Sequence, residues 1–203
     1  MNSESGLGQG FAVYMNVSLA AGGLPGEELD RRGDQVTADA LRWIPAPGHG
    51  RFFTWIHLFD PHTPYAPPEP YRTQYAGAPL DDVIAFVDSV LAQLTDARSA
   101  RGLYDNTLIV FTSDHGECLG EHGENAHGLF LYDVTLRVPL IIKFPGSRWR
   151  GRTVTEQVPG IDVAPTILKA LGVAVPSRLQ GQELICRAAG DRSQAAPPAF
   201  SET

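Results

Sequence analysis

Continuous apolar runs alternate along the chain with stretches in which apolar residues recur every three or four positions. The runs at 52–59, 107–112 and 137–144 predict buried strands, and Pro145 with Gly146 ends the last of them. Helical spacing at 34–44, 80–98 and 161–171 predicts three amphipathic helices, the second closed by Gly102 and the third by Gly172. This alternation indicates an α/β fold with a mixed, mostly parallel sheet layered between helices.

Three further segments lack such periodicity. The breaker cluster at 22–26 predicts an irregular lead-in over 1–33, and the segment after Gly190 is rich in Pro and Ala. Prolines at 61, 64, 67, 68 and 70 predict an extended loop directly after the first strand, because each ring removes a donor and restricts its predecessor. We therefore expect a folded body at 34–190, preceded by the lead-in and followed by a truncated C-terminal segment of no clear structure at 191–203.

Composition narrows the class of protein. With 203 residues, 43% of them hydrophobic and 19% charged, the chain suits one folded domain. Its net charge of −7 gives no electrostatic support to binding nucleic acid or coating another polyanion. The longest apolar runs fall well short of the roughly 20 residues of a membrane-spanning helix, so we expect no transmembrane segment.

The compartment stays open. The first residues show no basic region followed by an apolar stretch, so no signal peptide is visible. The two cysteines, Cys118 and Cys186, could form at most one bridge, and their spacing suggests no metal-binding pair. Cys118 is adjacent to the motif described next, but a lone cysteine is more often a small apolar filler than a nucleophile.

The densest functional signal is Thr112-Ser113-Asp114-His115-Gly116-Glu117, directly after a predicted strand. Ligands and catalytic groups of open α/β sheets gather beyond the carboxyl ends of strands. Asp114 offers a hard oxygen and His115 an imidazole nitrogen to a divalent cation, while Gly116 lets the backbone turn closely. Two ligands cannot hold a metal by themselves, so we expect others from elsewhere.

Two further histidines are candidates for contact with substrate. His62 lies in the rigid proline-rich loop, and His127 follows the Asp114 motif. An imidazole at either place could hydrogen-bond a charged ester oxygen or protonate a leaving group near neutral pH. For His57 and His49 we favour a purely structural or solvent-exposed role. The metalloprotease helix, the P-loop and the Gly-x-Ser-x-Gly elbow are all absent from the sequence.

These segments resemble the sulfatases of the alkaline phosphatase superfamily. The likeness is carried by residues 105–117, 120–123, 127–128, 132–133 and 136–142, by an upstream segment at 55–68 and by downstream segments at 162–173 and 198–203. It covers nearly the whole chain beyond about residue 10. The resemblance implies an alkaline phosphatase-like fold, of which 34–190 would be part of the catalytic domain.

The resemblance also assigns roles to residues. Asp114 and His115 match two ligands of one divalent metal ion, which could be calcium, magnesium, manganese or zinc. His115 stands where many relatives have Asn. His62 matches the histidine that contacts the sulfate ester. His127 falls where many sulfatases carry a substrate-binding Lys, and Glu117 with Tyr132 would be supporting residues.

The family's nucleophile, a formylglycine made from Cys or Ser in a Cys/Ser-x-Pro-Ser-Arg motif, has no counterpart here. The similar string at 174–178 begins with Ala174 and follows the metal pair instead of preceding it. We therefore expect a sulfuric ester hydrolase present as a central-to-C-terminal fragment, inactive by itself, with its N-terminal third missing.

Two alternatives stay open at this point. One is a phosphoryl or phosphoethanolamine transferase, or a phosphodiesterase, of the same superfamily. The other is a non-catalytic truncated product. The sequence does not indicate which sulfate ester is used or whether the chain is oligomeric.

Overall fold

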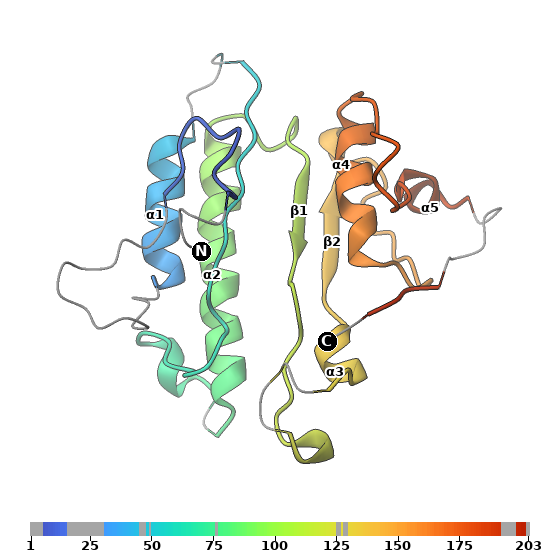
Figure 1. Ribbon diagram of the computed structural model, residues 1–203. Coiled ribbons are helices and arrows are strands. Elements are labelled where there is room, and N and C mark those ends of the chain that lie inside the picture. The colour runs from blue at the N-terminus through green and yellow to red at the C-terminus, as the bar shows by residue number, and fades with distance from the viewer. Residues whose placement is uncertain are drawn as a thin grey trace. The chain divides into compact units, whose positions relative to one another are not determined.

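The computed structural model describes residues 6–15, 31–44, 48, 50–75, 77–124, 127, 130–191 and 198–201. These residues belong to two compact units, 1–103 and 104–203, each described below by itself (Figure 1). Most of the expected lead-in, including the cluster at 22–26, lies outside the described residues, as do His49 and most of the C-terminal segment. In the described part of the chain, no helix is both long enough and apolar enough to span a bilayer.

Two helices build the first unit. Helix α1 (Gly33–Trp43) packs against α2 (Pro79–Ala100), and the short 3₁₀ helix η2 (Tyr71–Thr73) also packs on α2 (Figure 1). The buried core of this unit contains Ala40, Ile44, Val83, Phe86, Val87, Val90 and Leu94, whereas Ile84, an apolar residue at helical spacing in α2, is 48% exposed. Both helices are thus confirmed, with α2 extending slightly beyond its predicted range.

The ends of these helices are fixed by local chemistry. Pro79 begins α2, where a missing N–H costs nothing. At the other end Gly102 has φ +64°, and the N–H groups of Gly102 and Leu103 donate to the carbonyls of Ser99 and Arg98. This pattern is a Schellman motif, which explains why the glycine ends the helix.

The predicted buried strand at 52–59 is not a strand in the structure. These residues are extended but pair with no other strand among the described residues, and alternate side chains are exposed, with Phe53 58% and Trp55 50% accessible. His57 is also exposed. A continuous apolar run indicates burial on both faces, whereas only one face of this segment is covered within its unit.

The second unit is built around a two-stranded sheet. Strand β1 (Ile109–Thr112) pairs with β2 (Leu140–Lys143), with Ile109 opposite Lys143 and Thr112 opposite Leu140 (Figure 1). The remaining elements are η3 (Glu121–Gly123), α3 (Asp133–Leu136), η4 (Pro145–Ser147), η5 (Gly160–Asp162), α4 (Val163–Ala170) and α5 (Ile185–Ala189). Both strands fall inside their predicted runs and are shorter.

The pairing of β1 with β2 is antiparallel, whereas a mostly parallel sheet was expected. A continuous apolar run indicates that a strand is buried. It does not specify whether the neighbouring strand runs parallel or antiparallel to it. The ammonium group of Lys143 donates to the carbonyls of Tyr104, Asp105 and Thr107, and so holds the chain that enters β1 against the end of β2.

The predicted helix at 161–171 is present as η5 followed by α4. Gly172, at φ +71°, ends it in a second Schellman motif, in which Gly172 and Val173 donate to the carbonyls of Lys169 and Leu168. On the buried side of α4, the Thr166 hydroxyl donates to the carbonyl of Asp162 at 2.6 Å and accepts the Leu184 N–H at 2.9 Å. These contacts attach the segment leading into α5 to α4.

Candidate active site

The loop that follows β1 is shaped by its own side chains. The Ser113 hydroxyl donates to the carbonyl of His115 at 2.7 Å, and the His115 N–H donates to Asp114 Oδ1 at 3.2 Å. Short polar residues that bond to nearby backbone favour turns over continued strand. The strand therefore stops at Thr112 and presents Asp114 and His115 at its carboxyl end, where the sequence predicted a site.

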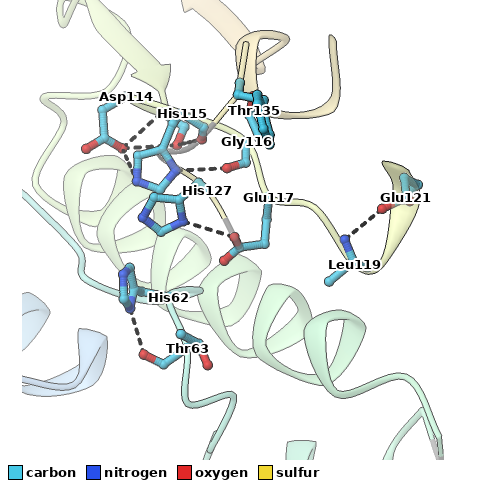
Figure 2. A network of polar contacts seen from close by, with 12 residues as sticks. His62, Thr63, Asp114, His115, Gly116, Glu117, Leu119, Glu121, His127 and Thr135 are labelled. Atoms are coloured by element: carbon cyan, nitrogen blue, oxygen red, sulfur yellow. Dashed lines mark hydrogen bonds and ion pairs between the residues drawn. The ribbon is translucent and has the colours of Figure 1, made fainter. Parts of the chain in front are cut away.

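The ring of His115 is oriented for ligation. Its Nδ1 lies 2.8 Å from the carbonyl oxygen of Gly116, so Nδ1 carries the proton and Nε2 presents its lone pair in the neutral ring (Figure 2). Metal-binding histidines typically donate their second N–H to a carbonyl or carboxylate in this way. Nε2 lies 3.9 Å from Asp114 Oδ1.

This pair fits part of a metal site. The 3.9 Å separation is shorter than two metal–ligand bonds of about 2.0–2.4 Å, so one cation could contact both atoms. The Asp114 side chain is 74% accessible and that of His115 is 38% accessible, so an ion could reach them. Among the described residues no group of three His, Cys, Asp or Glu gathers as a metal site, so these two residues do not complete one by themselves.

His127 lies beside this pair. Its ring stacks on that of His115, with centroids 3.8 Å apart and planes 28° apart, and its Nδ1 is 3.0 Å from Glu117 Oε1 (Figure 2). The carboxylate accepts a hydrogen bond from the Nδ1–H group and so fixes the orientation of the ring. The Glu117 side chain is only 12% accessible, which makes it a rigid support.

Gly116 is required by the close approach of a neighbouring segment. Its N–H donates to the carbonyl of Thr135 at 2.8 Å, and a Cβ at this position would lie 2.1 Å from the carbonyl oxygen of Val134. The sequence explained Gly116 as a turn near the metal pair. The structure adds the reason: α3 leaves no space for a side chain.

Cys118 is fully buried, and its interpretation as a filler agrees with its surroundings. Burial raises the pKa of its thiol, and the carboxylates of Glu124, Glu121 and Glu117 raise it further. A thiol that keeps its proton is a weak nucleophile. Cys118 and Cys186 are both free, so neither forms the one bridge that the sequence allowed.

His62 belongs to the first unit and is described against that unit alone. Its Nδ1 lies 2.6 Å from the carbonyl oxygen of Thr63, and its ring packs on that of Phe59 with centroids 4.3 Å apart (Figure 2). Two residues earlier, Asp60 Oδ2 accepts the N–H of Gly33, the first residue of α1, at 2.8 Å. Burial raises the pKa of the Asp60 carboxyl. The loop is thus anchored to α1.

The structure brings together three of the four site residues predicted from sequence, namely Asp114, His115 and His127. The contact between Glu117 and His127 was not predicted, since Glu117 was expected only as an unspecified support. The stacking of His122 on Tyr132, with centroids 4.1 Å apart, was also missed. Spacing along the chain carries no signal for either contact, because both depend on how the loop folds back.

The family model for sulfatases matches residues 21–173, and the chain belongs to the Sulfatase family. A curated relative, the N-acetylglucosamine-6-O-sulfatase of Bacteroides thetaiotaomicron, is 41% identical over 55% of this chain and 20% of its own length. The multifunctional alkaline phosphatase superfamily protein PehA of Trinickia caryophylli is 37% identical over 56% of this chain and 21% of its own length. The matched part of this chain therefore spans about a fifth of these relatives.

A solved structure supports the same fold. The phosphonate monoester hydrolase SpPMH from Silicibacter pomeroyi superposes with a TM-score of 0.70 at 23% sequence identity, over 79% of this chain and 43% of that one. The chain therefore has part of an alkaline phosphatase-like α/β fold, and this much of the expected architecture is confirmed. The Sulfatase family, to which the chain belongs, is a family of hydrolases.

Proposed function

We propose that the chain is part of a metal-dependent sulfuric ester hydrolase. The observation that carries the proposal is the Asp114–His115 pair directly after β1, with the Nδ1 proton of His115 engaged by the carbonyl of Gly116. This arrangement leaves Nε2 and a carboxylate oxygen 3.9 Å apart and accessible. Membership of the Sulfatase family supports the same reaction class.

Asp114 and His115 would hold one divalent cation together with ligands from outside the described residues. When bound, the ion supplies Lewis-acid polarisation of the ester oxygens. The mixed oxygen and nitrogen donors are compatible with calcium, magnesium, manganese or zinc. The contact from Ser113 to the His115 carbonyl keeps the loop in its ligating conformation before any ion arrives.

The two remaining histidines would act on the substrate. Glu117 accepts a hydrogen bond from the Nδ1–H group of His127. The Nε2 atom of that ring, when protonated, can therefore hydrogen-bond an ester oxygen or donate its proton to the leaving group. The Nδ1 of His62 is engaged by the carbonyl of Thr63, which orients its Nε2 in the same manner. We propose both as catalytic residues.

The substrate class we propose is a sulfate ester, in particular one carried by a sugar. Support comes from the relative at 41% identity, whose name assigns it to N-acetylglucosamine-6-O-sulfate. The nucleophile would come from residues outside this chain, because the only similar string has Ala174 at the nucleophile position. By this proposal the 203 residues alone do not turn over sulfate esters.

A second candidate is hydrolysis or transfer of a phosphate ester at the same site. The relative named as a multifunctional member of the alkaline phosphatase superfamily favours keeping it. Metal polarisation of the ester oxygens would serve sulfate and phosphate esters alike. The two candidates therefore differ in substrate and share the residues.

The test is hydrolysis by the gene product, expressed with any sequence that flanks these residues in its gene. We expect 4-nitrophenyl sulfate to be cleaved with a higher kcat/KM than bis(4-nitrophenyl) phosphate. Asp114→Asn should lower kcat/KM at least about a hundredfold, because the metal loses its charged ligand. Asp105→Asn, at an exposed position before β1, is the matched control and should leave the rate unchanged.

Faster cleavage of the phosphodiester would replace the first candidate with the second. An unchanged rate in Asp114→Asn would reject the assignment of this loop. Turnover by the 203-residue chain alone would show that the nucleophile lies within it.

A further inference from the structure

A basic loop follows β2 at residues 145–152, with the sequence Pro-Gly-Ser-Arg-Trp-Arg-Gly-Arg. Arg148, Arg150 and Arg152 are all exposed. In the described part of the chain none of the three forms an ion pair with a carboxylate, unlike Arg31, Arg32 and Arg42. The net charge of −7 argues against polyanion binding by the chain as a whole, but it averages over this local concentration of positive charge.

The loop is held in an unusual backbone conformation. Ser147 and Trp149 have φ values of +53° and +59°, a region that bulky side chains rarely adopt. The Trp149 ring packs edge-on against Phe144, which is buried, at 4.7 Å and 88°, and the Arg148 guanidinium lies over the same ring at 4.3 Å. Packing therefore fixes the direction of Arg148 before any ligand binds, which lowers the entropy cost of binding.

The three arginines have different surroundings. Arg152 Nη1 donates to the carbonyl of Ala188 at 3.2 Å, which attaches the loop to α5. Arg148 and Arg150 have no such role in the described structure. A planar guanidinium with several N–H donors matches the paired oxygens of a tetrahedral oxyanion.

We propose that Arg148 and Arg150 bind sulfate groups of a sulfated polysaccharide, at a surface separate from the Asp114–His115 site. Because Lys143 pairs with Ile109 at the start of β1, this loop lies at the opposite end of the ladder from Asp114. At about 3.4 Å per residue the separation is on the order of 15 Å, so only a polymeric ligand could engage both places. The choice of sulfate over other anions rests on the proposed function.

The surroundings of Trp149 argue against single-stranded nucleic acid as the ligand. Proteins that bind such strands offer exposed aromatic faces on which bases stack. Here the Trp149 ring is already occupied by Arg148 and Phe144. Recognition therefore rests on charge contacts between the arginines and the anionic groups of the ligand.

The test is binding of labelled dextran sulfate to the 203-residue chain, followed by fluorescence anisotropy, with uncharged dextran for comparison. The double variant Arg148→Gln/Arg150→Gln should bind at least about tenfold more weakly. Arg42→Gln removes the same type of charge from a side chain that is 75% accessible in the first unit, and should change the affinity less than about twofold. Circular dichroism checks that each variant is folded, and the single variant Arg150→Gln replaces the double one if that unfolds.

Equal affinities for the double variant and Arg42→Gln would overturn the proposal. Binding of poly(U) as tight as that of dextran sulfate at the same ionic strength would also overturn it, since the loop would then respond to charge alone. The outcome is separable from that of the proposed function, because the binding test compares arginine variants outside the Asp114–His115 site and does not depend on turnover. Loss of turnover with retained binding would therefore concern the catalytic site only.

Discussion

Single residues in the second unit are constrained by contacts that the sequence shows only in part. The sequence alone was enough to propose Asp114 and His115 as ligands, because their types and their place after a strand indicate metal chemistry. The tautomer of His115 and the support of His127 by Glu117 could not be predicted, since both depend on atoms brought close by folding. Gly116 was predictable in part. A glycine at this position suggested a tight turn, whereas the close approach of the Val134 backbone is visible only in the structure.

Replacing Gly116 by Ala tests that constraint. The added Cβ would lie 2.1 Å from the Val134 carbonyl oxygen, and backbone atoms cannot move aside as a flexible side chain would. We expect the free energy of unfolding to fall by about 1–3 kcal/mol, measured by urea denaturation. Gly160→Ala is the control, because a Cβ there meets nothing within 4 Å and should cost little. Equal losses in the two variants would contradict the packing argument.

A second residue-scale prediction concerns Asp60. Burial raises its pKa above the ordinary value of 3.8, so the folded chain binds this proton more tightly than the unfolded chain does. The contribution of Asp60 to stability therefore falls as the pH rises from that value through the raised pKa. Asp60→Asn keeps an oxygen to accept the Gly33 N–H and removes the charge.

We expect Asp60→Asn to be at least as stable as the wild type at pH 7, with its advantage shrinking toward pH 4, measured by urea denaturation at both values. Asp60→Ala loses the acceptor and should be less stable than Asp60→Asn at both pH values. An advantage of Asp60→Asn that grows on acidification would contradict the raised pKa.

Helices were predictable at the level of whole elements, and strands only partly. Helical spacing located α1, α2 and α4, and Gly102 and Gly172 marked two of their ends, because a Schellman motif depends on a local sequence feature. The prediction of a buried strand at 52–59 was wrong because the apolar character of a segment does not show how many of its faces are covered. The direction of β2 and the short helix α5 likewise depend on partners distant in sequence.

One buried hydroxyl, that of Thr166, links the segment entering α5 to α4, and Thr166→Val removes it at nearly constant volume. The Leu184 N–H would then lose its acceptor in a buried place. We expect a loss of about 1–3 kcal/mol in the free energy of unfolding, measured by urea denaturation. Thr155→Val, at an exposed position, is the control and should change it by less than about 0.5 kcal/mol. A loss no larger than that of the control would contradict a structural role for the hydroxyl.

In the molecule as a whole, resemblance to the sulfatases is the reason for assigning residues of both units to one proposed reaction. Three of the proposed site residues meet in the second unit, while His62 lies in the first and is assigned to the same reaction by resemblance to sulfatases. The two proposed metal ligands are among the described residues, which contain no group of three His, Cys, Asp or Glu that could hold an ion.

We propose that Asp114 and His115 hold the divalent cation of a sulfatase. The most direct test is a metal-binding titration of the gene product, expressed with its flanking sequence, with the wild type compared with Asp114→Asn and Asp105→Asn. We predict one bound divalent ion per chain, with affinity at least about tenfold weaker in Asp114→Asn and unchanged in Asp105→Asn. Equal affinity in all three proteins would contradict the account.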